Sequence, residues 1–158
     1  PPSAFRETNP VGHQATLPLP KTISLSADTT NISLMFQDYL ADSVTDTKTV
    51  FYTVKANNLN KTTGVISAKL DTLFTNVEFS ADPGAYTLLS GNAKLEESAS
   101  GYITVDTAGV NLMNRTTVSG NGKSTRGSFP VTYQAKALQD LSADYNPTQA
   151  LTITFADV

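Results

Sequence analysis

Short runs in which apolar and polar residues alternate recur along this chain of 158 residues. The clearest are Leu151–Ala156, near its end, and Ile23–Ala27, nearer its start. Successive side chains of a strand point to opposite faces, so a period of two predicts a strand with one buried and one solvated face. Turn signals such as Asp82-Pro83-Gly84 and Asn146-Pro147 separate the runs. The pattern predicts an all-β protein folded as an immunoglobulin-like β-sandwich.

The other predicted strands are short runs bounded by turn residues. They cover residues 32–36, 50–56, 65–70, 76–80, 85–89, 94–97, 102–106, 109–113, 115–119 and 129–138. Helical periodicity is weak, and residues 35–44 and 135–144 are each expected to form at most a turn or a loop. The absence of a fixed-period repeat argues against a solenoid or propeller. Residues 21–158 are therefore expected to form a single sandwich domain.

Residues 1–20 differ from the rest of the chain because five of the eight prolines lie there. Proline lacks a backbone N–H and fixes φ, so this segment is predicted to be an extended N-terminal arm rather than a central strand. The arm also holds His13, the only histidine. A catalytic triad needs a base that is held rigidly, which an arm cannot provide. We expect His13 to be exposed to solvent and not catalytic.

Composition narrows the function classes further. The net charge is −3 without a basic patch, which argues against binding to nucleic acid or to anionic membranes. The chain has no cysteine, which excludes disulfides, zinc–thiolate sites and thiol catalysis. No apolar run approaches the roughly 20 residues of a membrane span. Residues 1–5 lack the pattern of a signal peptide, so an exported protein is expected here in its processed form.

Acidic residues offer two candidate sites, and neither has the required spacing. Asp38, Asp42 and Asp46 are four residues apart and lack the close ligand spacing and central glycine of a calcium loop, so we interpret them as solvated loop acids. Adjacent Glu96 and Glu97 would point to opposite faces of a strand, so they do not form the facing pair of a glycoside hydrolase. The sequence therefore predicts no enzyme activity, no metal and no cofactor.

Gly122-Lys123-Ser124 is similar to the end of a phosphate-binding loop. The full motif needs a glycine five positions earlier, where this chain has Thr117. It also needs a helix to follow, whereas Phe129-Pro130-Val131 continues into a predicted strand. We therefore interpret the segment as a hairpin turn.

The two alternating runs become informative through a family resemblance. Lys21–Asp28, followed by Asn31–Leu34, resembles the N-terminus of chaperone–usher major pilins of the colonization factor antigen I type, which also lack cysteine. Tyr145 followed by Leu151–Phe155 resembles the ending of many such subunits. The resemblance implies an incomplete sandwich that is completed by a donor strand from another subunit. It implies Ile23, Leu25 and Ala27 as donor residues, and Leu151, Ile153 and Phe155 as acceptor-groove or chaperone-contact residues.

The same resemblance implies a structural subunit of a surface pilus or fimbria. Its partners would be other pilin subunits, a periplasmic chaperone and an outer-membrane usher, and its location the bacterial cell surface, reached through the periplasm. Adhesion to host cells through a receptor is a further expectation. An alternative function is a self-contained carbohydrate- or receptor-binding adhesin module, which the lack of tryptophan disfavours, and a virion decoration protein is a third.

Two structural questions stay open from the sequence. Alternation alone favours pairing of both runs inside one closed sandwich. About 20 residues also precede Lys21, whereas the donor strand of the family begins near the mature N-terminus. The arm has apolar positions of its own at Val11, Ala15, Leu17 and Leu19, interrupted by Pro18, and is therefore the alternative donor.

Overall fold

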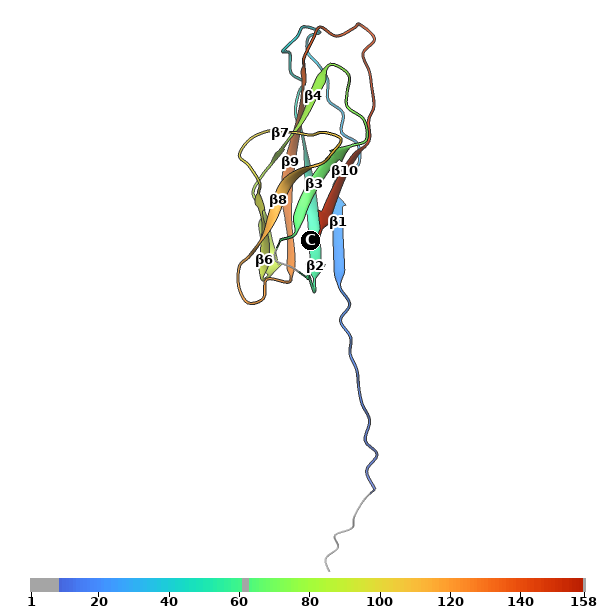
Figure 1. Cartoon of the computed structure of the whole chain (residues 1–158), viewed down its shortest axis with the longest axis vertical. Coiled ribbons are helices and arrows are strands. Elements are labelled where there is room, and N and C mark those ends of the chain that lie inside the picture. Colours follow the sequence, from blue (N-terminus) through green and yellow to red (C-terminus); the bar gives the residue numbers. More distant parts are fainter. Residues whose placement is uncertain (1–8, 61–62, 158) are drawn as a thin grey trace, which may run out of the picture.

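The computed structural model of the chain describes residues 9–60 and 63–157. These residues form ten strands and no helix. The strands are β1 (Thr22–Ala27), β2 (Lys48–Asn57), β3 (Val65–Leu70), β4 (Val77–Pro83), β5 (Thr87–Gly91), β6 (Ala93–Glu97), β7 (Ile103–Thr104), β8 (Val110–Thr117), β9 (Thr125–Ala137) and β10 (Leu151–Ala156). They form two antiparallel sheets (Figure 1), which confirms the prediction of an all-β sandwich. Over the same residues, no helix is long and apolar enough to cross a membrane.

The larger sheet has six strands and is built around β9. Its order is β1-β2-β9-β4-β7, and β5 also pairs with β9. The first residues of β9, Thr125–Ser128, pair with β5, and the rest, Val131–Ala137, pair with β4. The smaller sheet has the order β10-β3-β8-β6. In consequence β1 and β10, which are the first and last strands of the chain, each lie at the edge of a different sheet.

The core follows the alternation that the sequence shows. On β2, Val50, Tyr52 and Val54 are buried, and the residues between them are exposed. Tyr52 stacks on Phe129 with ring centroids 5.4 Å apart. Its hydroxyl also lies 2.6 Å from the hydroxyl of Tyr133, so both buried polar atoms have a partner. Burial raises the pKa of both tyrosines above the ordinary value.

Three local predictions are wrong. Residues 109–113 and 115–119 were expected as two strands, but β8 continues through both because Arg115 is buried and pairs with Leu95. Residues 32–36 form no strand, since only Phe36 is bridged, to Thr45. The segment around Gly122 is not a hairpin turn. It joins β8 to β9, which belong to different sheets.

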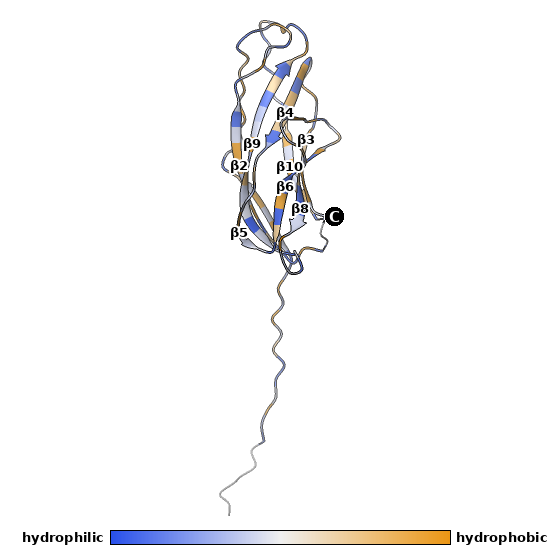
Figure 2. Ribbon diagram, turned by 90° about the vertical axis from the view of Figure 1, so that its left-hand side faces the viewer, coloured by the Kyte–Doolittle hydropathy of each residue, from blue (hydrophilic) through white to orange (hydrophobic). Residues whose placement is uncertain are grey.

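The sandwich is elongated and its two ends differ (Figures 1 and 2). We call the end where β1 begins the arm end, because the described part of the arm, residues 9–20, extends away from it. We call the opposite end, made by residues 28–47 and 138–150, the loop end. The prediction for residues 1–8 of the arm lies outside the described residues.

Candidate functional site at the first and last strands

The predicted donor run forms β1, and it pairs within the same chain. Its ladder with β2 runs from Thr22 opposite Asn57 to Ala27 opposite Tyr52. Only Leu25 is half-buried, and Ile23 is 38% exposed. The strand is therefore held mainly by backbone hydrogen bonds, with one apolar side chain packed against the core.

The predicted acceptor run forms β10, which pairs with β3 along one edge. Phe155 is buried, and Leu151 and Ile153 are half-buried against the core. The strand touches β1, although no ladder joins the two among the described strands. The structure thus brings the two predicted runs together as neighbouring edges of opposite sheets.

These two edges differ from the other edges of the sandwich. An unpaired strand edge attracts another strand, and proteins blunt such edges with charges, bulges or short length. At the far side, β6 carries a Lys94–Glu96 ion pair at 3.0 Å, β7 is two residues long, and β5 has a register shift between Leu88 and Ser90. Neither β1 nor β10 contains a charged residue or a proline. One side of the sandwich therefore has two unprotected edges.

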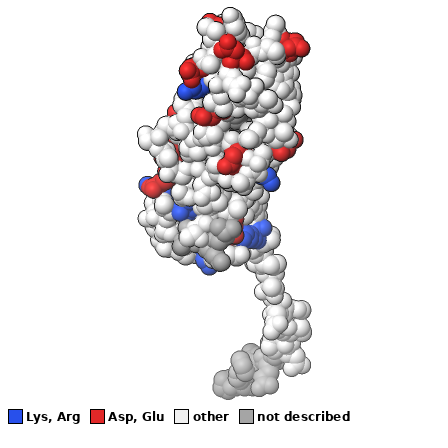
Figure 3. Space-filling view, turned by 45° about the horizontal axis from the view of Figure 1, so that its top comes forward, with Lys and Arg blue, Asp and Glu red and all other residues white. Residues whose placement is uncertain are grey.

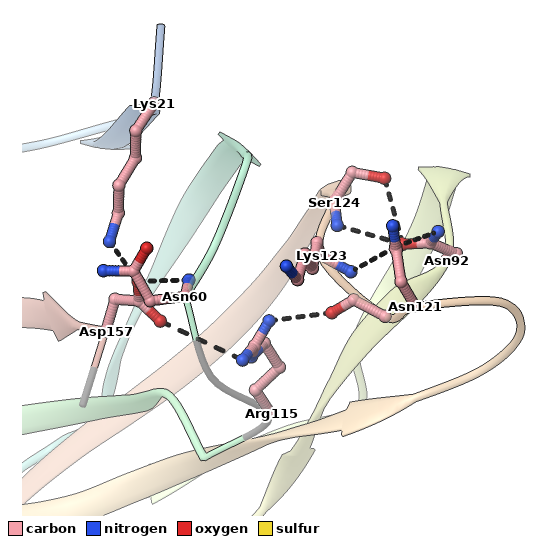
Figure 4. Close-up of polar contacts among 9 residues, drawn as sticks. Lys21, Asn60, Asn92, Arg115, Asn121, Lys123, Ser124 and Asp157 are labelled. Atoms are coloured by element: carbon pink, nitrogen blue, oxygen red, sulfur yellow. Dashed lines mark hydrogen bonds and ion pairs between the residues drawn. The ribbon is translucent and has the colours of Figure 1, made fainter.

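A charged cluster ties the arm end of β1 to the end of β10 (Figure 4). Lys21 donates from its ammonium group to the Asp157 carboxylate, which also accepts a hydrogen bond of 2.8 Å from the backbone N–H of Asn60. On the inner side, a guanidinium nitrogen of Arg115 lies 3.9 Å from Asp157. The side chains of Asp157 and Arg115 are 3% and 0% exposed, so this ion pair is shielded from solvent.

Arg115 and Asp157 are members of this cluster that the sequence analysis did not single out. Nη1 of Arg115 donates to the carbonyl oxygen of Gly122 at 2.7 Å, and within the described residues its Nε and Nη2 have no hydrogen-bond acceptor. Burial lowers the pKa of the guanidinium, and the Asp157 carboxylate acts in the opposite direction. The only signal in the sequence is its spacing, since Arg115 lies two positions after the buried Met113 on the same face of the strand.

The loop that carries Gly122 is fixed by amide side chains (Figure 4). Asn92 donates from its amide nitrogen to Asn121 at 2.9 Å and accepts from the backbone N–H of Ser124 at 3.0 Å. Gly122 has φ of 62°, and a Cβ there would meet Thr117 Oγ1 at 2.2 Å. This loop therefore needs glycine for its conformation and presents a carbonyl group to Arg115, rather than cradling a phosphate.

The aspartates that the sequence singled out make local hydrogen bonds and an ion pair at the loop end. Asp38 accepts from the backbone N–H of Tyr39 at 2.7 Å, and Asp46 accepts from that of Met35 at 2.8 Å. Asp42 lies 3.7 Å from Lys136. Across residues 9–60 and 63–157, no group of three or more acids and histidines is arranged to hold a metal ion. His13 is exposed in the arm.

A second feature, which the sequence did not indicate, is a cavity of about 780 Å³ at the loop end. Residues 32–39 line it together with Phe74, Phe79, Leu141 and Tyr145. The Tyr145 hydroxyl donates to the carbonyl oxygen of Thr75 at 2.8 Å, which fixes one side of the opening.

Comparison of the chain with protein-family models, with curated proteins and with solved structures found no match.

Proposed function

We propose that this protein is a structural subunit of a bacterial surface pilus or fimbria, polymerised by donor-strand exchange. The observation that carries the proposal is the pair of unprotected edges, β1 and β10, lying together on one side of the sandwich. In the polymer, β1 of one subunit takes the place of β1 in the next, beside its β2. The six residue pairs of the β1–β2 ladder define the register of that contact.

The chain has the features that such an exchange requires. The segment between β1 and β2, residues 28–47, contains no strand and only isolated bridges. Its first residues, 28–31, can release β1 while Ile32, Leu34 and Phe36 stay packed against the core, whereas a tight hairpin cannot release one strand alone. Release of β1 also exposes little apolar surface, because Leu25 is its only half-buried side chain. These features make β1 the element that is least costly to exchange.

The family resemblance implies a periplasmic chaperone and an outer-membrane usher as partners. The free edge of β10 is a place where they can bind. A periplasmic chaperone covers this edge before assembly by adding a strand beside residues 151–156. The outer-membrane usher then exchanges the chaperone for the next subunit. The finished polymer lies outside the cell, where a structural role rather than a catalytic one fits the described residues.

Two single-cysteine variants test the exchange directly, because the natural chain has no cysteine. Ser24 and Lys55 lie opposite each other in the β1–β2 ladder, and both are exposed. Residues paired in this way have Cα atoms about 4.5–5.5 Å apart, which suits a disulfide. Ser24→Cys and Lys55→Cys chains are unfolded together in urea, refolded as a mixture and oxidised. We expect a disulfide between the two chains, seen on non-reducing gels.

Thr49→Cys is the matched control for this experiment. Thr49 is also on β2 and exposed, but β1 ends before it reaches this residue. Cross-linking to the Ser24→Cys chain should therefore occur only with Lys55→Cys. Equal yields from Lys55→Cys and Thr49→Cys would show that β1 stays in its own chain and would refute strand exchange.

A self-contained carbohydrate- or receptor-binding module is the second candidate function. The cavity at the loop end favours it, because ligand sites are concave and of this volume. A stable monomer that binds a glycan array, with binding lost in a Tyr39→Ala variant, would support this function. A chain that forms ladders of multimers under mild denaturant supports the pilus subunit.

A further inference from the structure

We propose that the arm of one subunit, residues 9–20, lies in the loop-end cavity of the next subunit, head to tail. The inference rests on the polymer proposed above and names a second contact between its subunits. The inference does not depend on which subunit supplies β1. Whichever subunit supplies that strand, the arm leaves the sandwich beside Lys21, at the arm end (Figure 1).

The cavity has the lining that an extended, proline-rich peptide needs. Phe36, Tyr39, Phe74 and Tyr145 contribute aromatic rings to it, and Leu34 and Leu141 contribute aliphatic groups. Such segments adopt the polyproline II helix and dock in aromatic-lined grooves, at low cost in conformational entropy. Two lining side chains, Met35 and Tyr39, are 69% and 61% exposed, so a peptide can reach the cavity from solvent.

The arm has the matching composition. Its Leu17 and Val11 are 91% and 77% exposed and have no apolar partner within the described residues. Pro18 and Pro20 alternate with the leucines, so as a strand this stretch would lack two N–H donors on the same side. The arm is therefore less suited to a ladder than residues 22–27, and better suited to a groove that binds side chains.

Charge favours the same arrangement (Figure 3). The loop end carries Asp38, Asp42, Asp46, Asp140 and Asp144, with Lys48 and Lys136 as basic residues among them. The arm end carries mainly basic residues. These are Lys21, Lys55, Lys123 and Arg126. Head-to-tail contact therefore places the acidic loop end of one subunit against the basic arm end of its neighbour, which accelerates association at low salt.

Leu17 cannot reach the cavity of its own sandwich. Ile23 lies opposite Ala56, which lies opposite Thr125 on β9, so β1 begins level with the start of β9. Ala135 of the cavity is ten residues further along β9, about 33 Å away at the rise of a strand. Six residues link Leu17 to Ile23 and span at most about 21 Å. The amide nitrogen of Asn58 also holds the carbonyl oxygen of Leu19 at the arm end, at 3.1 Å.

A second cysteine pair tests this contact separately from strand exchange. Leu17→Cys chains, labelled with ¹⁵N, are mixed with unlabelled Met35→Cys chains at low salt and oxidised, and mass spectrometry measures the mixed dimers. The control partner is Val118→Cys, whose exposed residue lies at the arm end. We expect at least about ten times more dimer with Met35→Cys than with the control. We also expect the yield to fall severalfold in about 0.5 M NaCl, because added salt screens the charges.

Further variants make each outcome decisive. Tyr39→Ala, added to the Met35→Cys chain, should lower the yield about fivefold, since it removes an exposed aromatic wall without touching the core. Equal yields from Met35→Cys and Val118→Cys would show that the arm does not occupy the cavity, and would overturn the proposal. So would an intrachain disulfide in a dilute Leu17→Cys/Met35→Cys chain. Cross-linking between Ser24→Cys and Lys55→Cys without cross-linking at Met35→Cys would support strand exchange and reject arm docking. Cross-linking at Met35→Cys without the Ser24–Lys55 disulfide would support arm docking alone.

Discussion

Replacing Asp157 with asparagine tests whether the buried ion pair fastens the end of β10 to the rest of the sandwich. The substitution keeps the size of the side chain and removes its charge. Arg115 would then be a buried cation whose remaining contact in the described residues is the carbonyl oxygen of Gly122. We expect Asp157→Asn to destabilise the fold strongly, because an uncompensated buried charge is costly.

The magnitude follows from the geometry. At the 3.9 Å separation of the Arg115 and Asp157 charges, an effective dielectric constant of about 20 gives an attraction of about 4 kcal/mol. Removal of one partner from a buried pair costs about 3–5 kcal/mol. The contact with Lys21 adds at most about 1 kcal/mol, since this lysine is a third exposed. A loss of about 3 kcal/mol corresponds to a fall of about 6–12 °C in Tm for a domain of this size.

Urea unfolding followed by far-UV circular dichroism measures the effect, with Asp144→Asn as the control. Asp144 is an exposed loop residue, so its variant should lie within about 0.5 kcal/mol of the natural chain. The Arg115→Met/Asp157→Asn double variant removes both charges and should cost at least about 2 kcal/mol less than the sum of the two single variants. A loss below about 1 kcal/mol for Asp157→Asn, or additive single effects, would refute the reasoning.

Three further measurements check the sandwich itself. Gly127→Ala should lower the free energy of unfolding by about 1–3 kcal/mol, measured in thermal melts, because its Cβ would lie 2.4 Å from the Thr87 carbonyl oxygen. The control Gly12→Ala, with open space around it, should be neutral. Burial raises the pKa of Tyr52 and Tyr133, so above pH 10 the unfolded tyrosines ionise first and stability should fall, by up to about 1.4 kcal/mol per pH unit for each. A urea midpoint that changes equally between pH 9 and pH 11 in Tyr133→Phe and in the natural chain would contradict this. In hydrogen exchange, the amides of β1 should exchange faster than those of β9, and equal protection would argue against an easily released β1.

The pattern of alternation predicted the strands well where a strand has one buried and one solvated face. Residues 65–70 were predicted with the bounds that β3 has, and the final strand was placed within two residues. Residues 32–36 alternate in the same way, yet they form a loop, since Ile32, Leu34 and Phe36 pack over the end of the core without a neighbouring strand. Alternation reports which side chains face the core, and it does not report whether a backbone partner is present.

The candidate site was predictable only in part. The sequence marked the β1 and β10 runs as strands that need partners, but it did not show that they lie at neighbouring edges of opposite sheets, since sheet order depends on long-range pairing. Arg115 was missed because an arginine inside a strand normally indicates a solvated face. Its burial depends on Asp157, 42 positions later in the chain, and on the carbonyl group of Gly122.

The sequence left two candidate donor segments, residues 22–27 and the arm, which differ in their proline content. A donor strand must offer N–H groups to the strand beside it, and a segment without proline can do so from either side. Residues 22–27 contain no proline and retain all of these donors, whereas Pro18 and Pro20 remove two from the arm. This difference assigns backbone pairing to β1 and side-chain docking to the arm.

The division of roles also resolves an energetic difficulty in strand exchange. An exchanged β1 makes with the next subunit the same six residue pairs that it makes in its own. Exchange by itself therefore gains almost no free energy, and a tethered strand competes at an effective concentration in the millimolar range. A polymer of this subunit must be stabilised by contacts that exist only between subunits. The arm in the loop-end cavity is such a contact, because Leu17 cannot reach the cavity of its own sandwich.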